Sequence, residues 1–375
     1  MVLAAGLGTR LRPLTGSISK PMAPIVNRPV MHHILRLIKK HGFNQAVANL
    51  HYHPHAITNY FGRGQRVGVE LRYSLEPELL GTAGGVKAMH KFLSDGTFLV
   101  ISGDALTDLD LTTLLEQHRA SGGIATLALK RVDDPSKFGV VIRDKDGRIL
   151  GFQEKPEPGE ELSNLCNCGI YIFEPSIFDH IPKDAFYDFG TQLFPEFVTR
   201  EIPFYGFEIE GYWNDVGSLE QYRIGNFDAL TGKVDVEIPG KERSPGVYVG
   251  RGTRISRSAK LTPPILLGDY CRVGEDVSLT GPLVIGDHSV IEKGAALEGV
   301  IKWRAAQTGA GAKVEGGIIG RGAYIRDEVY IHDRVVVGDR CVIGAGSVLD
   351  EEVHLEPFTV IEADSHVREA GPPGS

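Results

Sequence analysis

The stretch LLGDYCRVGEDVSLTGPLVIGDHSVIEKGAALEGV, residues 266–300, carries an aliphatic residue at every sixth position. The register begins upstream and comprises Val249, Ile255, Leu261, Leu267, Val273, Leu279, Ile285, Ile291 and Leu297. Glycine often follows directly, as at Gly250, Gly268, Gly274 and Gly286, which suits a corner where a side chain or a negative φ would be awkward. A period of six with one inward residue per repeat predicts a parallel β-helix of triangular cross-section, because each coil buries its apolar face only against neighbouring coils.

The register returns with a new phase nearer the C-terminus, at Ile319, Ile325, Ile331, Val337, Ile343, Leu349, Leu355 and Ile361. The pattern is interrupted over residues 298–318, which include WRAAQTGAGAK. We predict that this interruption is a loop protruding from the stack. The repeat resembles the left-handed hexapeptide-repeat β-helix, so residues 246–375 are expected to form a domain of that fold.

Residues 1–231 follow a different rhythm, in which short β-rich runs alternate with helical patterns. Helices are predicted over 30–42 and 111–122, each ending at a glycine. This alternation predicts an α/β, Rossmann-like domain with a mostly parallel sheet, joined to the β-helix by a linker over 232–245. The first strand has only about four residues before the glycines, where five or six are usual. We therefore expect a few native residues to be missing there.

Composition limits the classes of function. The chain has 375 residues, 42% apolar and 23% charged, with 40 basic and 48 acidic residues and a net charge of −8. This balance gives no electrostatic reason to coat nucleic acid or anionic lipid. No apolar stretch approaches the roughly 20 residues that span a bilayer, and no export signal is recognisable. The four cysteines lack zinc-type spacing and fit reduced thiols, so a cytoplasmic protein is expected.

The opening stretch LAAGLGTRLRPLTGSISKP, residues 3–21, places glycines and then Arg10, Arg12 and Lys20 directly after a short apolar strand. It lacks the lysine of a Walker loop, and Leu11 stands where a dinucleotide fingerprint needs its third glycine. Bare backbone N–H groups with adjacent cations still favour a polyphosphate ligand.

The opening stretch resembles the signature of the sugar-1-phosphate nucleotidyltransferases. Further segments resemble that family's motifs in the family's order, namely EPELLGTAGGVKAM, SGDALTDLDL, KFGVV, FQEKP, NCGIYIF and WNDVGSLEQY. The resemblance covers essentially the whole chain. The first of these segments has the form found in mannose-1-phosphate guanylyltransferases, which implies GTP and mannose 1-phosphate as substrates and GDP-mannose and pyrophosphate as products.

The chemistry requires these residue types independently of the resemblance. A sugar 1-phosphate must attack the α-phosphorus of a nucleoside triphosphate in line, so several anions meet and must be neutralised. Mg²⁺ prefers carboxylate and phosphate oxygens, and Asp104 follows the apolar strand FLVIS at the edge where open α/β sheets bind ligands. Asp215 is the second metal candidate, by resemblance alone. The sugar phosphate is already ionised near neutral pH, so no general base is needed.

The resemblance also implies roles for the remaining residues. Arg10 and Lys20 would hold and neutralise the triphosphate. Lys155 would pair with the sugar phosphate, while Glu154, Asn167 and the backbone at Gly139 would bind sugar hydroxyls. The nucleotide would be surrounded by Leu3, Ala5, Gly6, Gly8, Thr9, Gly81, Thr82 and Asp104. Phe138 and Ser102 depart from the family pattern, which has Tyr and Asn there in many members and leaves the exact sugar and base open.

Alternatives remain open at this point. The β-helix could belong to an acyltransferase with His288, His332 or His354 as a base, although these histidines are isolated. The chain could be a non-catalytic regulatory relative, or the acceptor could be glucose 1-phosphate or a pseudosugar phosphate with another base. The histidines of HYHPH and MHHIL are expected to be solvated or packed, not zinc ligands. Because the ends and faces of a β-helix need covering, a homo-oligomer is expected.

Overall fold

The computed structural model describes residues 1–368, and their contacts group into two compact units. The first unit comprises residues 1–7 and 31–215, and the second comprises residues 8–30 and everything from residue 216 onward. The segment with Arg10 and Lys20 thus belongs to the same unit as the β-helix. The boundaries 1–231, 232–245 and 246–375 remain predictions about domains. No helix within residues 1–368 is both long and apolar enough to cross a membrane.

The first unit is built on a nine-stranded sheet whose main path runs in the order β10-β9-β11-β6-β1-β4-β5. The strands are β1 (Val2–Leu3), β4 (Gln45–Leu50), β5 (Glu70–Leu75), β6 (Phe98–Ser102), β8 (Ala125–Arg131), β9 (Gly139–Arg143), β10 (Ile149–Glu154), β11 (Leu165–Phe173) and β12 (Tyr205–Glu208). β6, β1, β4 and β5 are parallel, while β11 joins antiparallel to β6. The prediction of a mostly parallel α/β sheet is confirmed.

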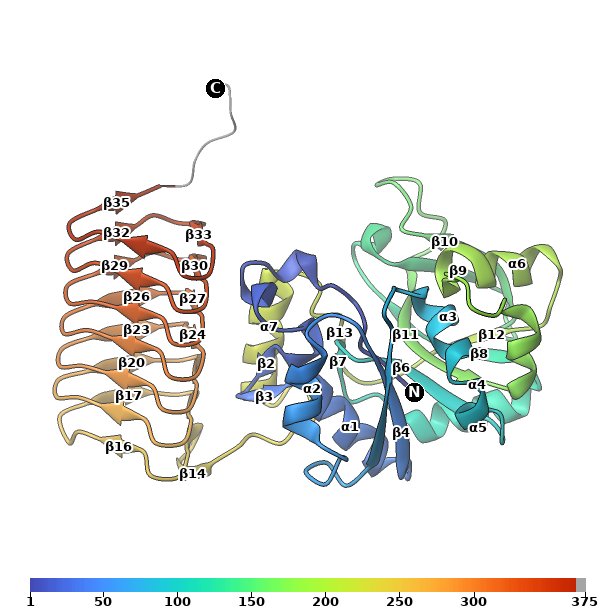
Figure 1. Ribbon diagram of the computed structural model, residues 1–375, viewed down its shortest axis with the longest axis horizontal. Helices are drawn as coiled ribbons and strands as arrows, with labels where there is room; N and C mark the ends of the chain where they lie inside the picture. The colour runs from blue at the N-terminus through green and yellow to red at the C-terminus, as the bar shows by residue number, and fades with distance from the viewer. Residues whose placement is uncertain (369–375) are drawn as a thin grey trace. The chain divides into compact units, whose positions relative to one another are not determined.

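Helices lie against the faces of this sheet (Figure 1). They are α1 (Val30–Lys40), α2 (Pro54–Phe61), α3 (Gly81–Ala88), α4 (His90–Leu93), α5 (Leu111–Ser121) and α6 (Phe194–Thr199). α1 and α5 confirm the two predicted helices. α5 ends where Gly122 takes a left-handed conformation with φ of 65° and donates its N–H to the His118 carbonyl, as a C-terminal cap requires.

The second unit stacks its strands into a β-helix with three parallel sheets (Figure 1). The first sheet holds β15 (Val247–Val249), β18 (Ile265–Leu267), β21 (Leu283–Ile285), β24 (Ile301–Lys302), β27 (Ile318–Ile319), β30 (Val336–Val337) and β33 (His354–Leu355), with β14 (Lys241–Ser244) antiparallel at its edge. The second holds β16 (Arg254–Ile255), β19 (Arg272–Val273), β22 (Val290–Ile291), β25 (Gln307–Thr308), β28 (Tyr324–Ile325), β31 (Val342–Ile343) and β34 (Val360–Ile361). The third holds β17 (Lys260–Thr262), β20 (Ser278–Thr280), β23 (Ala296–Glu298), β26 (Lys313–Glu315), β29 (Tyr330–Ile331), β32 (Val348–Leu349) and β35 (His366–Val367).

The periodic aliphatic residues line the interior, as predicted, and Leu267, Leu279 and Ile285 are fully buried. The glycines of the repeat serve close approach, since a Cβ at Gly268 would lie 2.6 Å from the Asp287 backbone nitrogen. The left-handed corner falls two residues later, at Tyr270 with φ of 56°. The glycine therefore solves a steric problem between coils, and a different residue absorbs the positive φ.

The predicted protruding loop at 298–318 is wrong. β24, β25 and β26 continue the three sheets through this region, pairing with the coils on both sides. Two steps along the chain are five residues long instead of six, from Leu297 to Lys302 and from Val314 to Ile319, which shifts the phase. The pattern was also hidden because the inward positions of this coil hold Lys302 and Thr308, both buried and polar.

The second unit also contains short elements from the N-terminal segment and one helix. These are three short 3-10 turns (Thr9–Leu11, Leu14–Gly16 and Lys20–Met22), the hairpin strands β2 (Pro24–Ile25) and β3 (Arg28–Pro29), and α7 (Leu219–Leu230). Tyr222 of α7 is fully buried, donates its hydroxyl proton to the Pro24 carbonyl (2.6 Å) and accepts from the Trp303 indole N–H (2.8 Å). α7 therefore joins the hairpin to the β-helix.

Candidate active site

The motif SGDALTDLDL begins where β6 ends, beside β1. The Gly103 N–H donates to the Leu3 carbonyl over 2.8 Å. A Cβ at Gly103 would lie 2.7 Å from that oxygen, so only glycine permits this approach. Asp104 follows directly, at the carboxyl end of a parallel strand where open α/β sheets bind ligands.

The motifs SGDALTDLDL and WNDVGSLEQY meet in a two-stranded ribbon. β7 (Leu106–Thr107) pairs antiparallel with β13 (Trp213–Asn214), with Leu106 opposite Asn214. Two further contacts to Tyr212 hold this ribbon, since Thr107 donates to its carbonyl (2.8 Å) and Asp108 accepts from its N–H (2.6 Å). Asp215 directly follows Asn214, and Asp104 lies two residues before Leu106. Because the two strands are antiparallel, the pairing brings both aspartates to the same end of the ribbon. More than a hundred positions separate them in the sequence.

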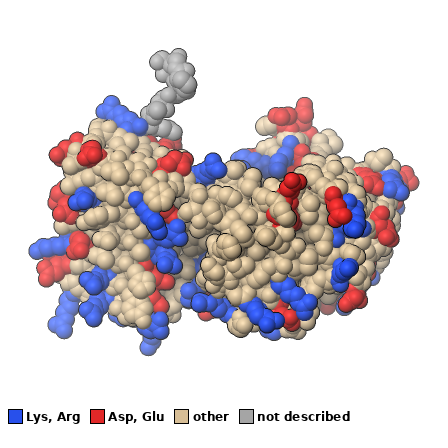
Figure 2. All heavy atoms as spheres, in the orientation of Figure 1, with Lys and Arg blue, Asp and Glu red and all other residues tan. Residues whose placement is uncertain are grey.

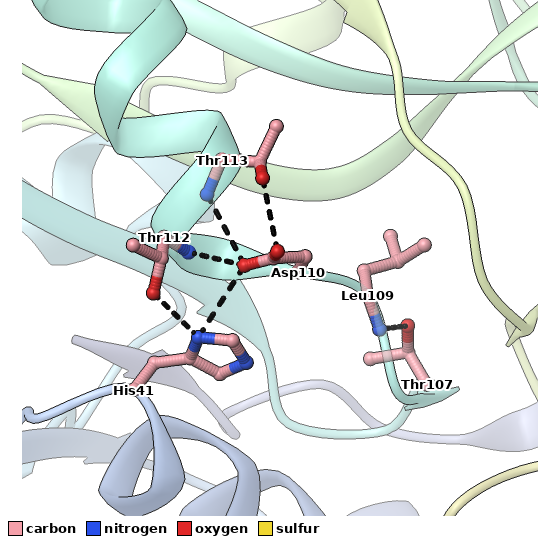
Figure 3. Close-up of polar contacts among 6 residues, drawn as sticks. All are labelled: His41, Thr107, Leu109, Asp110, Thr112 and Thr113. Carbon is pink, nitrogen blue, oxygen red and sulfur yellow. Dashed lines mark hydrogen bonds and ion pairs between the residues drawn. The ribbon is translucent and has the colours of Figure 1, made fainter.

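The last aspartate of this motif, Asp110, has a structural role (Figure 3). It caps the N-terminus of α5 by accepting from the Thr112 N–H at 2.9 Å and the Thr113 N–H at 3.1 Å. These bonds, led by the one from Thr113, lower the pKa of Asp110. His41 lies beside the cap, 2.8 Å from the Thr112 hydroxyl, and burial lowers its pKa. Asp108 and Asp110 therefore stabilise the fold around Asp104.

A buried polar relay ties together the carboxyl ends of β1, β4 and β5. The Asn49 side chain accepts from the Ala4 N–H at 2.8 Å and donates to Glu76 at 2.9 Å. The other carboxylate oxygen of Glu76 accepts from the Leu80 N–H at 3.2 Å. Asn49 and Glu76 are each 3% exposed. The relay thus links the strand of the opening motif to the segment that contains Gly81.

Gly81 and Thr82 are held by a segment from much later in the chain. Gly81 has φ of 74°, and a Cβ there would lie 2.5 Å from the Tyr187 carbonyl oxygen. The Thr82 hydroxyl donates to Asp188 and accepts from the Phe189 N–H, both at 2.8 Å. Glycine is therefore required at 81, and the Thr82 hydroxyl is engaged within the protein. The predicted contact with the nucleotide therefore falls to the backbone of Gly81 and Thr82.

Glu154 and Gly139 face each other at the ends of β10 and β9. A Cβ at Gly139 would lie 3.0 Å from a Glu154 carboxylate oxygen, and one at Gly190 would lie 2.3 Å from the same oxygen, so two glycines line this carboxylate. Burial raises the pKa of Glu154, against the opposing effect of Lys155. The Lys155 ammonium lies 3.4 Å from the carboxylate. A partly buried acid beside a more exposed cation suits a ligand with hydroxyls and a phosphate.

Asn167 lies at an irregularity of β11, where the pairing with β8 shifts register. Its amide donates to the Tyr171 hydroxyl at 2.8 Å and accepts from the Gly169 N–H at 3.0 Å. The indole of Trp213 donates to the Cys168 carbonyl at 3.0 Å, and Phe138 packs on its ring 5.2 Å away, centroid to centroid. Trp213 therefore connects the segments KFGVV and NCGIYIF to the ribbon that precedes Asp215.

The predicted triphosphate residues form their own cluster in the second unit. Gly8 has φ of 64°, and a Cβ there would lie 2.8 Å from the Lys20 Cβ. Gly8 precedes the short turn of Thr9 and Arg10, and its carbonyl accepts from the Thr15 hydroxyl at 2.8 Å. Arg10 is exposed and Lys20 is 8% exposed. The turn with Arg10 thus rests directly on the backbone and Cβ of Lys20.

The remaining predicted residues divide by exposure. Leu3 is the last residue of β1, Ala5 is buried, and Gly6 is exposed with no atom within 4 Å of the position a Cβ would take.

All four cysteines are unpaired and buried, and burial raises the pKa of Cys166 to about 12. His51 binds the Glu76 carbonyl. Within residues 1–368 no three histidine, cysteine or acidic side chains converge in a way that could hold a metal.

Sequence reasoning did not identify several residues that shape the site. Asn49 had a signal, because it is a polar residue at the end of the apolar strand QAVANL. Glu76 lay inside a quoted motif, yet only the structure assigns it to the relay. Asp188 and Tyr187 had no signal, since they touch Thr82 and Gly81 across more than a hundred positions.

Comparisons with known proteins agree with this architecture. The family model described as nucleotidyl transferase matches residues 1–231, and the bacterial transferase hexapeptide model matches residues 316–351. A UTP–glucose-1-phosphate uridylyltransferase from Synechocystis is 45% identical over 264 residues, or 67% of this chain and 68% of the relative. A mannose-1-phosphate guanylyltransferase from Mycobacterium tuberculosis is 34% identical over 275 residues, 70% of this chain and 76% of the relative.

Among solved structures, HddC from Yersinia pseudotuberculosis complexed with GMP-PN is 28% identical. The match has a TM-score of 0.53 and covers 60% of this chain and 96% of that chain.

Proposed function

The chain belongs to the nucleotidyl transferase family and is a sugar-1-phosphate nucleotidyltransferase. We propose that it transfers the nucleoside monophosphate group of a nucleoside triphosphate to the phosphate of a hexose 1-phosphate, with pyrophosphate as the leaving group. The observation that carries the mechanism is the β7–β13 ribbon, which takes Asp104 and Asp215 to one end. An in-line attack on the α-phosphorus needs the negative charge of both substrates to be neutralised where they meet.

The metal expected for this chemistry fits the residues present. Two carboxylates from different motifs at one end of the ribbon would supply oxygen donors of the kind that Mg²⁺ prefers. Asp104 and Asp215 would hold the ion, and the Asp108 contact to Tyr212 would keep the two segments in register. When bound, the ion would neutralise charge on the phosphates.

The protein's own groups divide the remaining work. Arg10 presents a planar fork of donors to phosphate oxygens, and Lys20 supplies a second positive charge beside it. Lys155 would pair with the phosphate of the sugar, and Glu154 would accept hydrogen bonds from sugar hydroxyls. Asn167 would complete the sugar contacts from β11. The backbone of Gly6, Gly81 and Thr82 would accommodate the nucleotide, because glycine allows a ligand to approach the main chain closely.

Two pairs of substrates are candidates, each favoured by its own observation. The 45% identity to a UTP–glucose-1-phosphate uridylyltransferase favours UTP with glucose 1-phosphate. The form of the EPELLGTAGG segment and the guanylyltransferase relative at 34% identity favour GTP with mannose 1-phosphate. We rank UTP with glucose 1-phosphate first because its relative is the more similar.

A substrate matrix tests both levels of the proposal. GTP, UTP, dTTP, ATP and CTP are each combined with mannose 1-phosphate, glucose 1-phosphate and glucosamine 1-phosphate in Mg²⁺, and released pyrophosphate is measured. We expect UTP with glucose 1-phosphate to give the highest kcat/KM. If GTP with mannose 1-phosphate leads, the ranking of the pairs is reversed while the reaction class stands. No pyrophosphate from any pair would overturn the reaction class. Consumption of acetyl coenzyme A would instead favour the acyltransferase alternative.

We also propose that the chain is a homo-oligomer through its β-helix. Residues 241–260 contain six Lys or Arg and one Glu, whereas residues 350–364 contain six acidic residues and no Lys or Arg. Figure 2 shows basic side chains gathered at the end of the β-helix near β14 and β16. At the other end Phe358 and Val360 are 63% and 62% exposed. Light scattering at rising salt tests the state, and a monomer at every salt concentration would overturn it.

A further inference from the structure

The segment that carries Arg10 and Lys20 is fastened to the β-helix by a buried carboxylate. The Ser17 hydroxyl donates to one carboxylate oxygen of Asp339 over 2.6 Å. Arg321 donates from one terminal nitrogen to the Ser17 hydroxyl at 3.2 Å and to the same Asp339 oxygen at 2.9 Å. Asp339 is 2% exposed, which is unusual for an aspartate on the outside of a β-helix. The three groups form a closed triangle of hydrogen bonds.

Further contacts fix the other end of this segment to the same stack. The Asn27 amide donates to the Ile285 carbonyl at 2.7 Å, and the Val26 N–H donates to Asn226 of α7 at 3.0 Å. Pro24 is held through Tyr222, which is itself bound to Trp303. The chain from Ser17 to Asn27 is therefore anchored at both ends, and Lys20 lies between the anchors.

Beyond the corner bond, Asp339 contacts both the Ser17 hydroxyl and the Arg321 guanidinium. The second oxygen of Asp339 accepts from the Arg321 N–H at 2.7 Å, across the corner between coils. Asp327 makes the same corner contact to the Ala310 N–H at 2.8 Å, but it is exposed. The corner bond is thus a general feature of the repeat, and the contacts to Ser17 and to the Arg321 guanidinium are additions at Asp339.

We propose that Asp339 and Arg321 are positioning residues for nucleotidyl transfer, acting through Ser17 on the cationic segment. The inference rests on the proposed function, in which Arg10 and Lys20 bind the triphosphate. Ser17 is three residues from Lys20, and Gly8 packs on the Lys20 Cβ, so a shift of the anchor is transmitted to the turn that carries Arg10. The β-helix then takes part in binding the nucleotide.

The test compares Asp339→Asn and Ser17→Ala with the matched control Asp327→Asn. Asparagine keeps an oxygen for the corner bond in both coils. At position 339 it also removes the negative charge that holds Arg321 and the carboxylate oxygen that accepts from Ser17. We expect the KM for the nucleoside triphosphate to rise about 5–20-fold in Asp339→Asn and Ser17→Ala, with the KM for the sugar phosphate changed less than about twofold. The control is expected to behave as the wild type in both parameters.

Hydrogen exchange of residues 8–30 supplies a readout independent of turnover. These amides are expected to exchange faster in Asp339→Asn than in Asp327→Asn, while the two variants melt within a few degrees of each other. Wild-type turnover with an unchanged triphosphate KM in Asp339→Asn and Ser17→Ala would overturn the inference alone. Absence of turnover in the wild type would overturn the proposed function, and equal exchange in the two variants would then overturn the anchoring as well.

Discussion

Lys302 donates to the Thr308 hydroxyl over 2.6 Å inside the β-helix, at two successive positions where the neighbouring coils carry aliphatic residues. The Lys302 ammonium also donates to the Val290 carbonyl at 3.0 Å. The side chain is fully buried, and burial lowers its pKa from 10.5 to about 7. Burying this group therefore opposes folding whenever the unfolded chain would hold the proton.

Replacing both partners by apolar residues of similar size is expected to stabilise the protein. Lys302→Leu combined with Thr308→Val leaves neither hydroxyl nor ammonium without a partner, so the gain should be about 1–3 kcal/mol at pH 7. Thermal unfolding monitored by circular dichroism measures it. The single Thr308→Val variant is the control, and it should be less stable than the double variant because it leaves the ammonium with fewer acceptors. A double variant less stable than the wild type would contradict this account.

The same lysine predicts how stability depends on pH. Between pH 7 and about 10 the unfolded chain binds a proton at Lys302 that the folded chain does not, so stability rises with pH by at most about 1.4 kcal/mol per unit. Below pH 7 both states hold the proton and the cost is constant. The advantage of the double variant should consequently shrink as pH rises from 7 to 9. An advantage independent of pH in unfolding experiments would exclude titration of Lys302 as its cause.

The relay between Asn49 and Glu76 predicts a coupled loss of stability and nucleotide binding. Asn49→Leu leaves the Ala4 N–H and the Glu76 carboxylate without this buried partner, at an expected cost of about 2–4 kcal/mol. The KM for the triphosphate should rise more than the KM for the sugar phosphate, because the relay joins the segments of Ala5 and Gly81. The measurements are chemical denaturation and steady-state kinetics. Asn44→Leu, an exposed position, is the control.

Glu154 predicts a conflict between stability and activity. Burial raises its pKa, so the folded chain binds a proton that the unfolded chain releases in the interval between the two pKa values. The ionised form therefore lowers stability at pH 7, and Glu154→Gln should raise the melting temperature there while making little difference near pH 4. The same change should raise the KM for the sugar phosphate about tenfold or more. A variant with unchanged stability at both pH values would refute the effect of burial.

Sequence reasoning located elements better than it located the contacts between them. The sixfold aliphatic register predicted the β-helix because burial in each coil repeats locally. It failed at residues 298–318, where polar Lys302 and Thr308 fill the interior by bonding to each other. Asp104 was predicted from its strand, but its approach to Asp215 depends on the β7–β13 pairing, which joins segments distant in sequence. Asp339 accepts a hydrogen bond from Ser17, which lies 322 positions earlier in the sequence, and no local pattern encodes such a contact.

The pair Asp104 and Asp215 gives the most direct test of the metal site. Asp104→Asn and Asp215→Asn preserve the shape of each side chain but remove the negative charge that a hard cation requires. Each variant is expected to lose at least about 10³-fold in kcat and to melt within a few degrees of the wild type. Asp110→Asn serves as the contrast, because Asp110 caps α5 and its loss should reduce stability by about 1 kcal/mol with little change in kcat. Titration with Mg²⁺ completes the comparison, since replacing a metal ligand raises the Mg²⁺ concentration needed for half-maximal activity. Full activity in either Asp104→Asn or Asp215→Asn would remove that residue from the site, and loss of folding in both would assign them a structural role like that of Asp110.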